Sequence, residues 1–522
     1  MLRILKKMFK VNNHNIYNQN DTYDRQNNGN IDKTCASESL EDNKNFLSTS
    51  FKSSSDIVFY EFEGYSDAKA LIVYIDGLVN KEMLNRDVID PFIEKSKEVG
   101  IEENLKKPQA LKRLIHVANV QETKMMSEVT DAILSGDTAM FFEGSGSVFI
   151  IDSKGWEKRA VTEPDIEAVV RGPREGFVES IRVNTALLRR KIKNSNLVFE
   201  NLKLGKQTQT DISIVYIDGI VNKEVLLEVR KRLNKIDTDS ILESGYIEQF
   251  IEDKYFSLLS TVGNTMKPDI VAAKILEGRV AIFCDGTPHV LTVPNLFIEN
   301  IQSAEDYYVR PMIASFLRMI RLLSFVISIL LPAVYVALST YHQEMIPTVL
   351  LITMAGAREG VPLPALAEAF LMVLMFEFLR ESGIRLPRPV GSAISIVGAL
   401  VIGEAAVNAG LVSAPMVIVV AITAVTSFIV PALTDVMIIN RFILLFLAGV
   451  MGLYGITCGV FVMIVHAVSL RSFGIPFTSP RAPFNLEGMK DYGLRLPLWS
   501  MIKRPQSIAK NNKKRRGNTG GE

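Results

Sequence analysis

The stretch 389–434 carries a single charged side chain, Glu404, among its 46 residues. A carboxylate in so apolar a segment is costly to hold in hydrocarbon, so it usually faces protein, water or an ion path. Val397, Val401, Glu404 and Asn408 recur every three or four residues, which places them on one stripe of a helix. Such a stripe suits a cation pore, because apolar rings gate by dewetting and rings of Glu select cations.

A second face of the same predicted helix is made of small residues, Ser392, Ser395, Ala399 and Gly403. Small faces allow membrane helices to approach each other closely. Another interpretation of Glu404 stays open at this point. Its carboxylate either lines a pore, or it lies near a helix end, where it reaches the membrane surface or pairs with an Arg of another span.

A charged connector with two prolines precedes this helix, and its candidate coupling residues are Arg358, Glu359, Pro362 and Pro364. Acidic residues follow in an otherwise apolar stretch, namely Glu368, Glu377 and Glu381, with Arg380 and Arg385 as possible partners. These acidic side chains either pair with the arginines or line a vestibule, or they belong to an amphipathic helix at the membrane surface.

The elements that position this region include an internal repeat in the first half of the chain. Residues 72–84 and 214–226 match at 11 of 13 positions, and a second pair of segments shares the same separation of 142 residues. Each copy opens with an apolar strand that ends at Asp-Gly, at Asp76-Gly77 and at Asp218-Gly219. Ligands often bind at the carboxyl ends of strands, but we favour simple turns here, because no phosphate-binding loop is adjacent.

Between the two copies lies a turn motif, formed by Arg171, Gly172, Pro173 and Arg174. A helix with several basic residues follows it, and these residues face either an acidic partner or water.

Composition excludes several classes of protein. The net charge of +1 gives no argument for a nucleic-acid partner, and the three cysteines, Cys35, Cys284 and Cys458, form no metal-binding or disulfide pattern. The histidines are scattered, so we expect no catalytic set, no metal and no cofactor.

The predicted fold is an α/β soluble N-terminal half of two repeated subdomains, followed by an all-α polytopic membrane domain. Apolar spans are expected at 322–340, 392–409, 412–432 and 442–470, whereas 346–380 forms either a re-entrant pair or two further crossings. The expected parts are a disordered start (1–56), repeat 1 (57–155), a linker (156–204), repeat 2 (205–300), the membrane domain (301–470) and a basic tail (471–522). Basic flanks before the first span and after the last place both termini in the cytoplasm.

Several motifs resemble those of the A subunits of GerA-type spore germinant receptors. They are the doubled VYIDG block, RGPREGF, AREGVPLP, PRPVG, SIVGALVIGEAAVNAGLVSAPMVIVVAITAVTSF and SFGIPFTSPRAPF, which together cover about 57–500. The resemblance implies a non-enzymatic subunit of a nutrient-sensing complex in the spore inner membrane.

The resemblance further implies partners and a mechanism. The expected partners are a transporter-like B subunit that binds the germinant, a lipoprotein C subunit, membrane lipid, and further copies of the chain in a homo-oligomer, expected to be a pentamer. The assembly would be a ligand-gated ion channel that releases monovalent cations, with Val401 at its constriction. The alternative is a secondary transporter of the nutrient or ion, but membrane-helix repeats typical of transporters are not detected, because the repeat lies in the soluble half.

Overall fold

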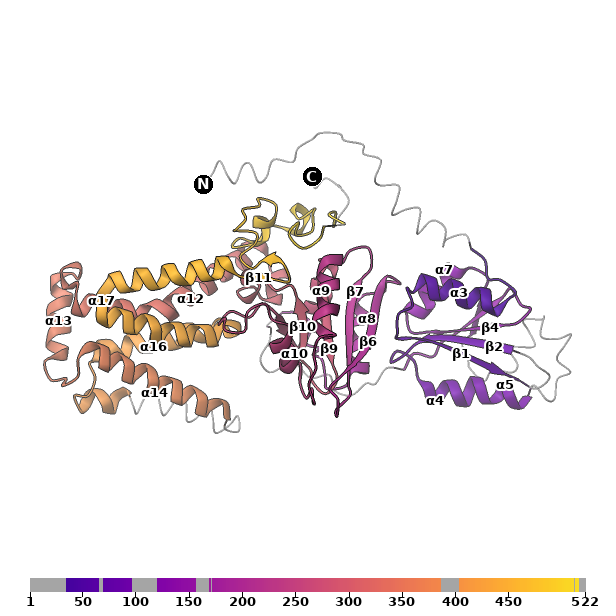
Figure 1. Ribbon diagram of the computed structural model, residues 1–522, viewed down its shortest axis with the longest axis horizontal. Coiled ribbons are helices and arrows are strands. Elements are labelled where there is room, and N and C mark those ends of the chain that lie inside the picture. Colours follow the sequence, from indigo (N-terminus) through magenta and orange to yellow (C-terminus); the bar gives the residue numbers. More distant parts are fainter. Residues whose placement is uncertain are drawn as a thin grey trace, which may run out of the picture. The chain divides into compact units, whose positions relative to one another are not determined.

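The computed structural model describes residues 34–64, 69–95, 120–155, 169, 171–385, 403–510 and 512–515. The chain divides into two compact units (Figure 1). The repeat unit comprises Met1–Glu252, Val262–Pro294 and Leu498–Glu522, and the helical unit comprises Asp253–Thr261 and Asn295–Pro497.

The first sheet of the repeat unit has the strand order β1-β2-β4-β5-β3, with antiparallel neighbours throughout. Its strands are β1 (Ile57–Glu63), β2 (Lys69–Ile75), β3 (Val120–Thr123), β4 (Thr138–Phe142) and β5 (Val148–Ile151). Helices α3 (Leu40–Ser50) and α7 (Met126–Leu134) lie on one face, and α4 (Lys81–Leu84) and α5 (Asp90–Lys95) lie on the other (Figure 1). β2 and β4 are apolar on both sides because both faces of the sheet are covered.

The second sheet repeats this order as β6-β7-β9-β10-β8. Its strands are β6 (Leu197–Leu204), β7 (Thr210–Ile217), β8 (Gly263–Thr265), β9 (Val280–Cys284) and β10 (Val290–Val293), and its helices are α8 (Ile181–Lys191), α9 (Lys223–Leu233), α10 (Ser244–Ile251) and α11 (Pro268–Leu276). The repeat seen in the sequence is therefore also a repeat of topology, and the N-terminal half is α/β as predicted, with antiparallel sheets.

Two details differ from the sequence expectations. Helix α3 lies within the stretch 1–56 that we expected to be disordered, and it is held because Leu47 and Phe51 are fully buried in the first core. In each copy, a strand also precedes the apolar strand that the repeat revealed, since β1 pairs with β2 and β6 pairs with β7. β6 has only three consecutive fully buried residues at its start, so it lacks the long apolar run that marks β7 in the sequence.

The described C-terminal segment packs on the second repeat. Ile508 and Ala509 are fully buried, and Ala509 lies beside Gly278. Arg504 donates from Nε to the carbonyl oxygen of Leu276 at 2.9 Å. This part of the basic tail is therefore a component of the repeat unit.

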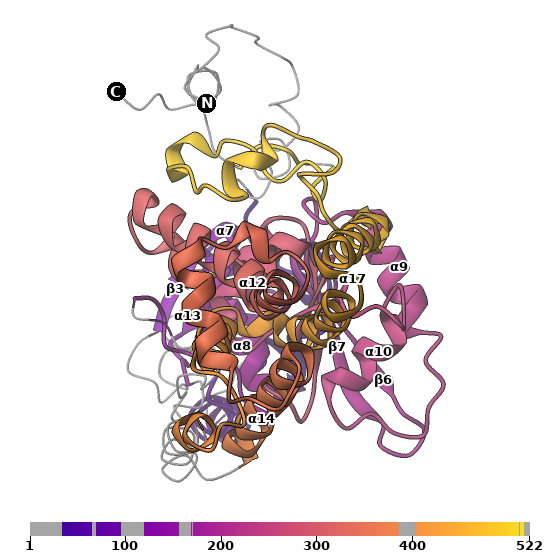
Figure 2. The ribbon, with the colours of Figure 1, turned by 90° about the vertical axis from the view of Figure 1, so that its left-hand side faces the viewer.

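The helical unit consists of long helices that run side by side (Figures 1 and 2). They are α12 (Pro311–Thr340), α14 (Ala365–Arg385), α16 (Ala414–Phe428) and α17 (Thr434–Ser469), and a helical segment covers 403–408. The short α13 (Thr348–Arg358) lies across the end of this bundle. Among the described residues, two helical stretches, Pro311–Thr340 and Pro431–Ser469, are by length and composition apolar enough to cross a membrane.

Helix α17 reverses direction at Gly452, whose φ of 61° and ψ of −142° are not helical. A Cβ at position 459 would lie 2.5 Å from Leu444 Cδ2, and Gly455 packs against Leu447, so the arms 434–451 and 453–469 are antiparallel. Glycines on the second arm permit this close approach. The single final span expected over 442–470 is therefore wrong, because a glycine in an apolar run gives no sign of a reversal.

The start of α12 is fixed by a buried charge network. Asp306 is fully buried and accepts from Arg318 Nε at 2.7 Å and from Arg321 Nη2 at 2.9 Å. Arg318 also donates to Asp491 Oδ1 at 2.7 Å, which joins the segment after the last helix to the first helix of the bundle.

Candidate functional site

The predicted pore stripe is only partly within the described residues. Val397 and Val401 lie outside them, as do Ser392, Ser395 and Ala399 of the predicted packing face. The described part is the helical segment 403–408, which ends in a turn at Ala409 and Gly410.

Within this segment the two predicted faces have different surroundings. Gly403 is buried, and a Cβ there would lie 3.5 Å from Val417 Cγ1 of α16. Ala406 packs against the core of the helical unit. Glu404 and Asn408 are exposed in the single chain, and the described part of the chain gives Glu404 no ion-pair partner. The segment thus turns its small face to the bundle and its polar face outward.

The connector residues lie at the start of α14. Arg358 is the last residue of α13, and its Nε lies 3.7 Å from Oε2 of Glu368. Glu359, Pro362 and Pro364 are exposed, and the carbonyl oxygen of Pro364 accepts from the N–H of Glu368 at 3.0 Å. A proline just before the first turn is compatible with this helix start, because its carbonyl remains available.

Glu368 joins the connector to the start of α16. Its side chain is fully buried, and Oε1 accepts from both the N–H of Ser413 at 2.6 Å and the hydroxyl of Ser413 at 2.5 Å. A carboxylate at a helix N-terminus satisfies free N–H groups and interacts favourably with the helix dipole. Glu368 therefore fixes the turn that leads out of the predicted pore helix, which ends at Gly410.

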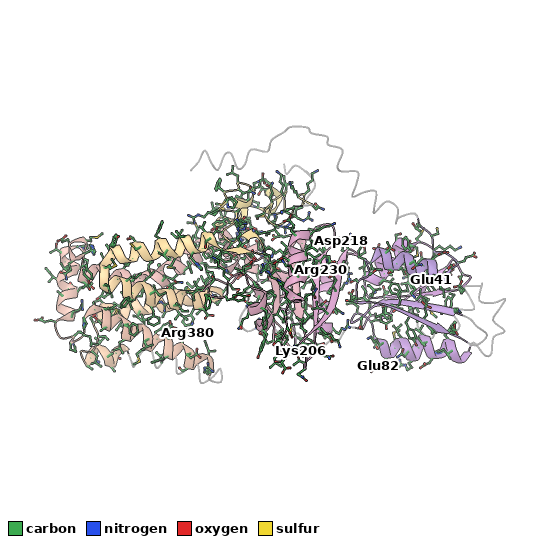
Figure 3. All side chains as sticks on the ribbon, viewed as in Figure 1. Glu41, Glu82, Lys206, Asp218, Arg230 and Arg380 are labelled. Carbon is green, nitrogen blue, oxygen red and sulfur yellow. The ribbon has the colours of Figure 1, made fainter. Side chains whose placement is uncertain are left out.

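Arg441 forms a second buried ionic contact, which links three helices. Its Nη1 donates to Glu377 Oε1 of α14 at 2.8 Å, and its Nη2 donates to Ser328 Oγ of α12 at 2.8 Å. Arg380, also on α14 (Figure 3), lies 2.9 Å from Glu377 Oε2. Arg441 is 1% exposed. Charges inside an apolar bundle are costly unless paired, so this cluster fixes the relative positions of the three helices.

The sequence pointed to Arg380 as a partner for Glu377, as observed, but it did not reveal the contact of Glu377 with Arg441 or that of Glu368 with Ser413. An Arg inside an apolar run, such as Arg441, is itself a signal for a buried acidic partner. Ser413 and Ser328 carry no such signal, because serines are common in membrane helices and their contacts depend on helix packing.

The two Asp-Gly sites are turns in which the glycine adopts a positive φ, 88° at Gly77 and 85° at Gly219. Asp76 pairs with Lys81 Nζ at 2.7 Å and lies 3.7 Å from Arg182 Nη1, whereas Asp218 lies 3.7 Å from the exposed Lys52. The copies thus share a turn but differ in charge partners.

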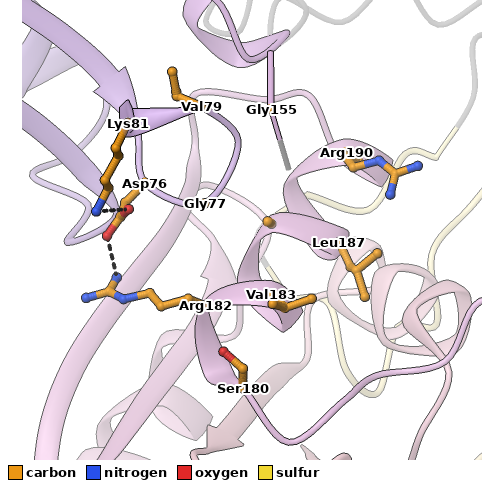
Figure 4. A pocket seen from close by; sticks show the side chains of 11 residues that line it. Asp76, Gly77, Val79, Lys81, Gly155, Ser180, Arg182, Val183, Leu187 and Arg190 are labelled. Carbon is orange, nitrogen blue, oxygen red and sulfur yellow. Dashed lines mark ion pairs between the residues drawn. The ribbon is translucent and has the colours of Figure 1, made fainter. Parts of the chain in front are cut away.

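A pocket of about 210 Å³ adjoins the first of these turns (Figure 4). Asp76 and Lys81 line it from the first repeat, and Arg182 and Arg190 line it from α8. The charged groups of the pocket already have partners. Arg190 lies 3.3 Å from Glu175, and Asp76 pairs with Lys81 and Arg182. The pocket is therefore a junction between the repeats without a free charge that would attract a ligand.

The motif at 171–177 is mainly structural. Arg171, Gly172 and Arg174 are exposed and Pro173 is half-buried, while Phe177 is buried edge-on against Phe283 at 5.3 Å between ring centroids. The basic helix α8 also differs from expectation, because Arg189 faces neither solvent nor a partner protein. It is fully buried and donates to both carboxylate oxygens of Asp56. Asp56 lies beside β1, so this pair joins the two repeats.

The described residues contain no group of His, Cys, Asp or Glu arranged to hold a metal ion. A repeated α/β unit combined with an apolar bundle held by buried ion pairs is the architecture of a membrane-associated protein. The contacts described above are ion pairs and hydrogen bonds that hold the helices and the two repeats together.

Comparison with known proteins agrees with this class. The family model for the Bacillus/Clostridium GerA spore germination protein matches residues 45–507. Spore germination protein KA of Bacillus subtilis is 47% identical over 469 residues, which cover 89% of this chain and 86% of that protein. The uncharacterized membrane protein YfkQ of B. subtilis is 42% identical, with 91% and 92% covered.

A solved structure is also similar, the N-terminal domain of the A subunit of the Bacillus megaterium spore germinant receptor GerK3. It shares 35% identity and a TM-score of 0.40, and the match covers 51% of this chain and 98% of that domain. The chain belongs to the GerA family of spore germination proteins.

Proposed function

We propose that this protein is the A-type subunit of a nutrient germinant receptor, and that copies of it form a ligand-gated channel for monovalent cations. The observation that carries the channel proposal is the exposure of Glu404 and Asn408 beside the buried Gly403. A carboxylate and an amide on the outer face of a helix in an apolar bundle require water or another subunit. A ring of such helices would surround an aqueous path.

Helical spacing places two valines on the same stripe, where they are the candidates for the gate of the channel. Val401 and Val397 precede Glu404 by three and seven residues, which puts them on the same stripe as Glu404 and Asn408. Apolar rings at Val401 would close the path by dewetting, and the Glu404 ring would set the preference for cations.

The contacts of the helical unit support an even number of crossings. α12 ends beside the α17 reversal, where Tyr341 donates to the carbonyl oxygen of Gly449 at 2.8 Å. α14 starts at this end, the described segment 403–408 ends there beside Gly360, and α16 starts there. With the two arms of α17, we propose six crossings, one of which is the stretch that ends at Gly410. Each arm is about 26 Å long at 1.5 Å per residue, close to the ~30 Å of a hydrocarbon core.

The packing of the C-terminal tail agrees with an even number of membrane crossings. The described part of the C-terminal segment packs on the second repeat, and the two lie on either side of the helical unit in the chain. This packing supports a location of both on the same face of the membrane. We place this face in the spore core and the helical unit in the inner membrane, with no catalytic role.

The partners follow from this function. A germinant-binding, transporter-like B subunit would supply binding energy that shifts the channel from closed to open, and a lipoprotein C subunit would complete the complex. The connector at Arg358 and Glu368 would transmit the shift, because it touches the turn that follows the pore helix.

Substitution of Val401 tests the gate. Val401→Ala should leak K⁺ from proteoliposomes and should trigger germination without nutrient, because a smaller side chain weakens dewetting of the constriction. Ile418→Ala is the matched control, since Ile418 is an exposed apolar residue of α16 and is not part of the stripe. If Val401→Ala conducts no more than the control, the pore assignment is wrong. Nutrient uptake by the unmodified chain alone would instead favour a transporter.

A further inference from the structure

The loop Asp253–Thr261 connects α10 to β8 of the second repeat, yet its contacts assign it to the helical unit. A loop that packs outside the subdomain to which it belongs in sequence forgoes contacts with that subdomain. Specific bonds must therefore hold it in place. The loop has several.

These bonds all lead to the end of α17. Ser257 Oγ lies 3.1 Å from His466 Nε2, one turn before the helix ends at Ser469. Asp253 Oδ2 accepts from the N–H of Phe473 at 2.9 Å, and the carbonyl oxygen of Thr261 accepts from Ser472 Oγ at 2.6 Å. Both ends and the middle of the loop are therefore attached to the terminus of the last helical arm.

The loop directs two aromatic side chains outward. Phe256 is fully exposed, Tyr255 is 73% exposed, and Leu258 beside them is also exposed. Such a cluster on an attached loop is unfavourable in water, because each aromatic ring leaves about 150–250 Å² of surface unburied.

The adjoining surface indicates what covers these rings. The arm 453–469 exposes an apolar face that includes Phe461, Val462, Val465 and Val468, and His466 lies in the same turns. In a membrane this face contacts acyl chains. The loop is therefore held at the level where this lipid-facing surface ends, which is where aromatic residues concentrate in membrane proteins.

We propose that Asp253–Thr261 is a lipid-anchoring loop that inserts Tyr255 and Phe256 into the boundary between headgroups and acyl chains. The occupant is the bilayer leaflet at the C-terminal end of α17. The aromatic rings bury their apolar parts there while the Tyr hydroxyl stays hydrated. The inference rests on the membrane placement of the helical unit but not on channel activity.

The anchor has a structural consequence for the second repeat. The loop is part of the chain between α10 and β8, so a lipid contact at Phe256 ties this repeat to the membrane surface through its own backbone.

Depth-dependent fluorescence quenching tests the proposal in the full-length protein. The two native tryptophans, Trp156 and Trp499, are replaced by Phe, and Phe256→Trp is reconstituted into vesicles of phosphatidylethanolamine and phosphatidylglycerol. We expect a blue-shifted emission that is quenched more by lipid spin-labelled near the headgroup than by lipid labelled near the chain end.

Two reference variants make the result decisive. Val465→Trp, on the apolar face of α17, should be quenched by acyl-chain labels, and Tyr60→Trp, on β1 of the first repeat, should not be quenched. If Val465→Trp is not quenched, the membrane placement itself fails. If Val465→Trp is quenched but Phe256→Trp is not, the lipid anchor is overturned, with red emission indicating water and blue emission indicating a protein partner.

Discussion

Arg441 of α17 and Glu377 of α14 form an ion pair in the interior of the helical unit, with 2.8 Å between Nη1 and Oε1. The guanidinium also donates to Ser328 Oγ and to the carbonyl oxygen of the same residue. One side chain thus joins three helices that are distant in the sequence, and it does so where water cannot replace a lost partner.

Removal of Arg441 should therefore be severely destabilising. Arg441→Met leaves Glu377 with Arg380 alone and is expected to cost about 3–5 kcal/mol. Thermal unfolding in detergent measures the loss. Arg385→Met is the control, because Arg385 pairs with Glu381 on an exposed surface and should cost less than about 1 kcal/mol. Equal shifts for the two variants would show that the buried pair has no special role.

Neutralisation of Glu368 should loosen the connector. Glu368→Gln keeps the shape of the side chain but leaves Arg358 without its acidic neighbour and weakens the cap on α16, at a cost of about 1–3 kcal/mol. We expect a lower melting temperature and faster K⁺ leakage from vesicles. Glu359→Gln, on the exposed neighbour, should change neither, and a leak common to both variants would contradict the model.

The Asp56–Arg189 pair should control the junction between the repeats. Next to it, the N–H of Phe199 donates to Ser54 Oγ and the N–H of Ser55 donates to the carbonyl oxygen of Phe199, both at 2.9 Å. Arg189→Ala removes the buried cation and should accelerate hydrogen exchange at these amides by at least about ten-fold, since a loss of 1.4 kcal/mol already has this effect. Arg190→Ala, which removes a half-exposed pair, should leave them protected.

The reversal at Gly452 should tolerate no side chain. Its backbone lies in a region reserved for glycine, and a Cβ would lie 2.8 Å from His342 Cε1. Gly452→Ala is expected to destabilise the helical unit by about 1–3 kcal/mol from backbone strain alone. Gly356→Ala is a control with the opposite expectation, because a Cβ there meets no atom within 4 Å and alanine favours a helix. Thermal unfolding of both variants in detergent checks the difference in sign.

The thiol of Cys284 should react slowly with alkylating reagents. Burial, together with Glu243 and Asp285, raises its pKa to about 12. Because the pKa is raised, the folded state favours the neutral thiol. The protonated thiol of Cys284 therefore contributes fully to stability below pH 9, and this contribution is lost as the pH rises toward 12. Maleimide labelling at neutral pH should modify the exposed Cys35 quickly and Cys284 only after unfolding. Equal labelling rates in single-cysteine variants would refute this assignment.

Much of the architecture could be predicted from the sequence. The two copies of the VYIDG block predicted two similar α/β subdomains, and the identical strand orders confirm the repeat. The apolar run before Thr340 predicted a long helix, which α12 forms. These features depend on neighbouring residues, because strand and helix periodicity and the length of an apolar run are properties of a local segment.

Partners that are distant in the chain could not be predicted for the charged residues in this way. Arg189 reads as part of an exposed basic helix, yet it pairs with a residue 133 positions earlier in the chain. Arg441 binds Ser328 across 113 positions, and Glu368 binds Ser413 across 45. The reversal at Gly452 could not be predicted either, because in the sequence the two arms of α17 read as one continuous apolar span.

By itself, the sequence determined that the chain has a repeated α/β half, an apolar helical half and the motifs of a germination family. Only the tertiary structure decided which charges are buried together, where the last apolar run folds back, and that the loop at Phe256 is attached to the end of α17. The physical reason is that the energy of a buried charge or an exposed ring depends on the groups that packing brings beside it, and sequence spacing does not specify those groups.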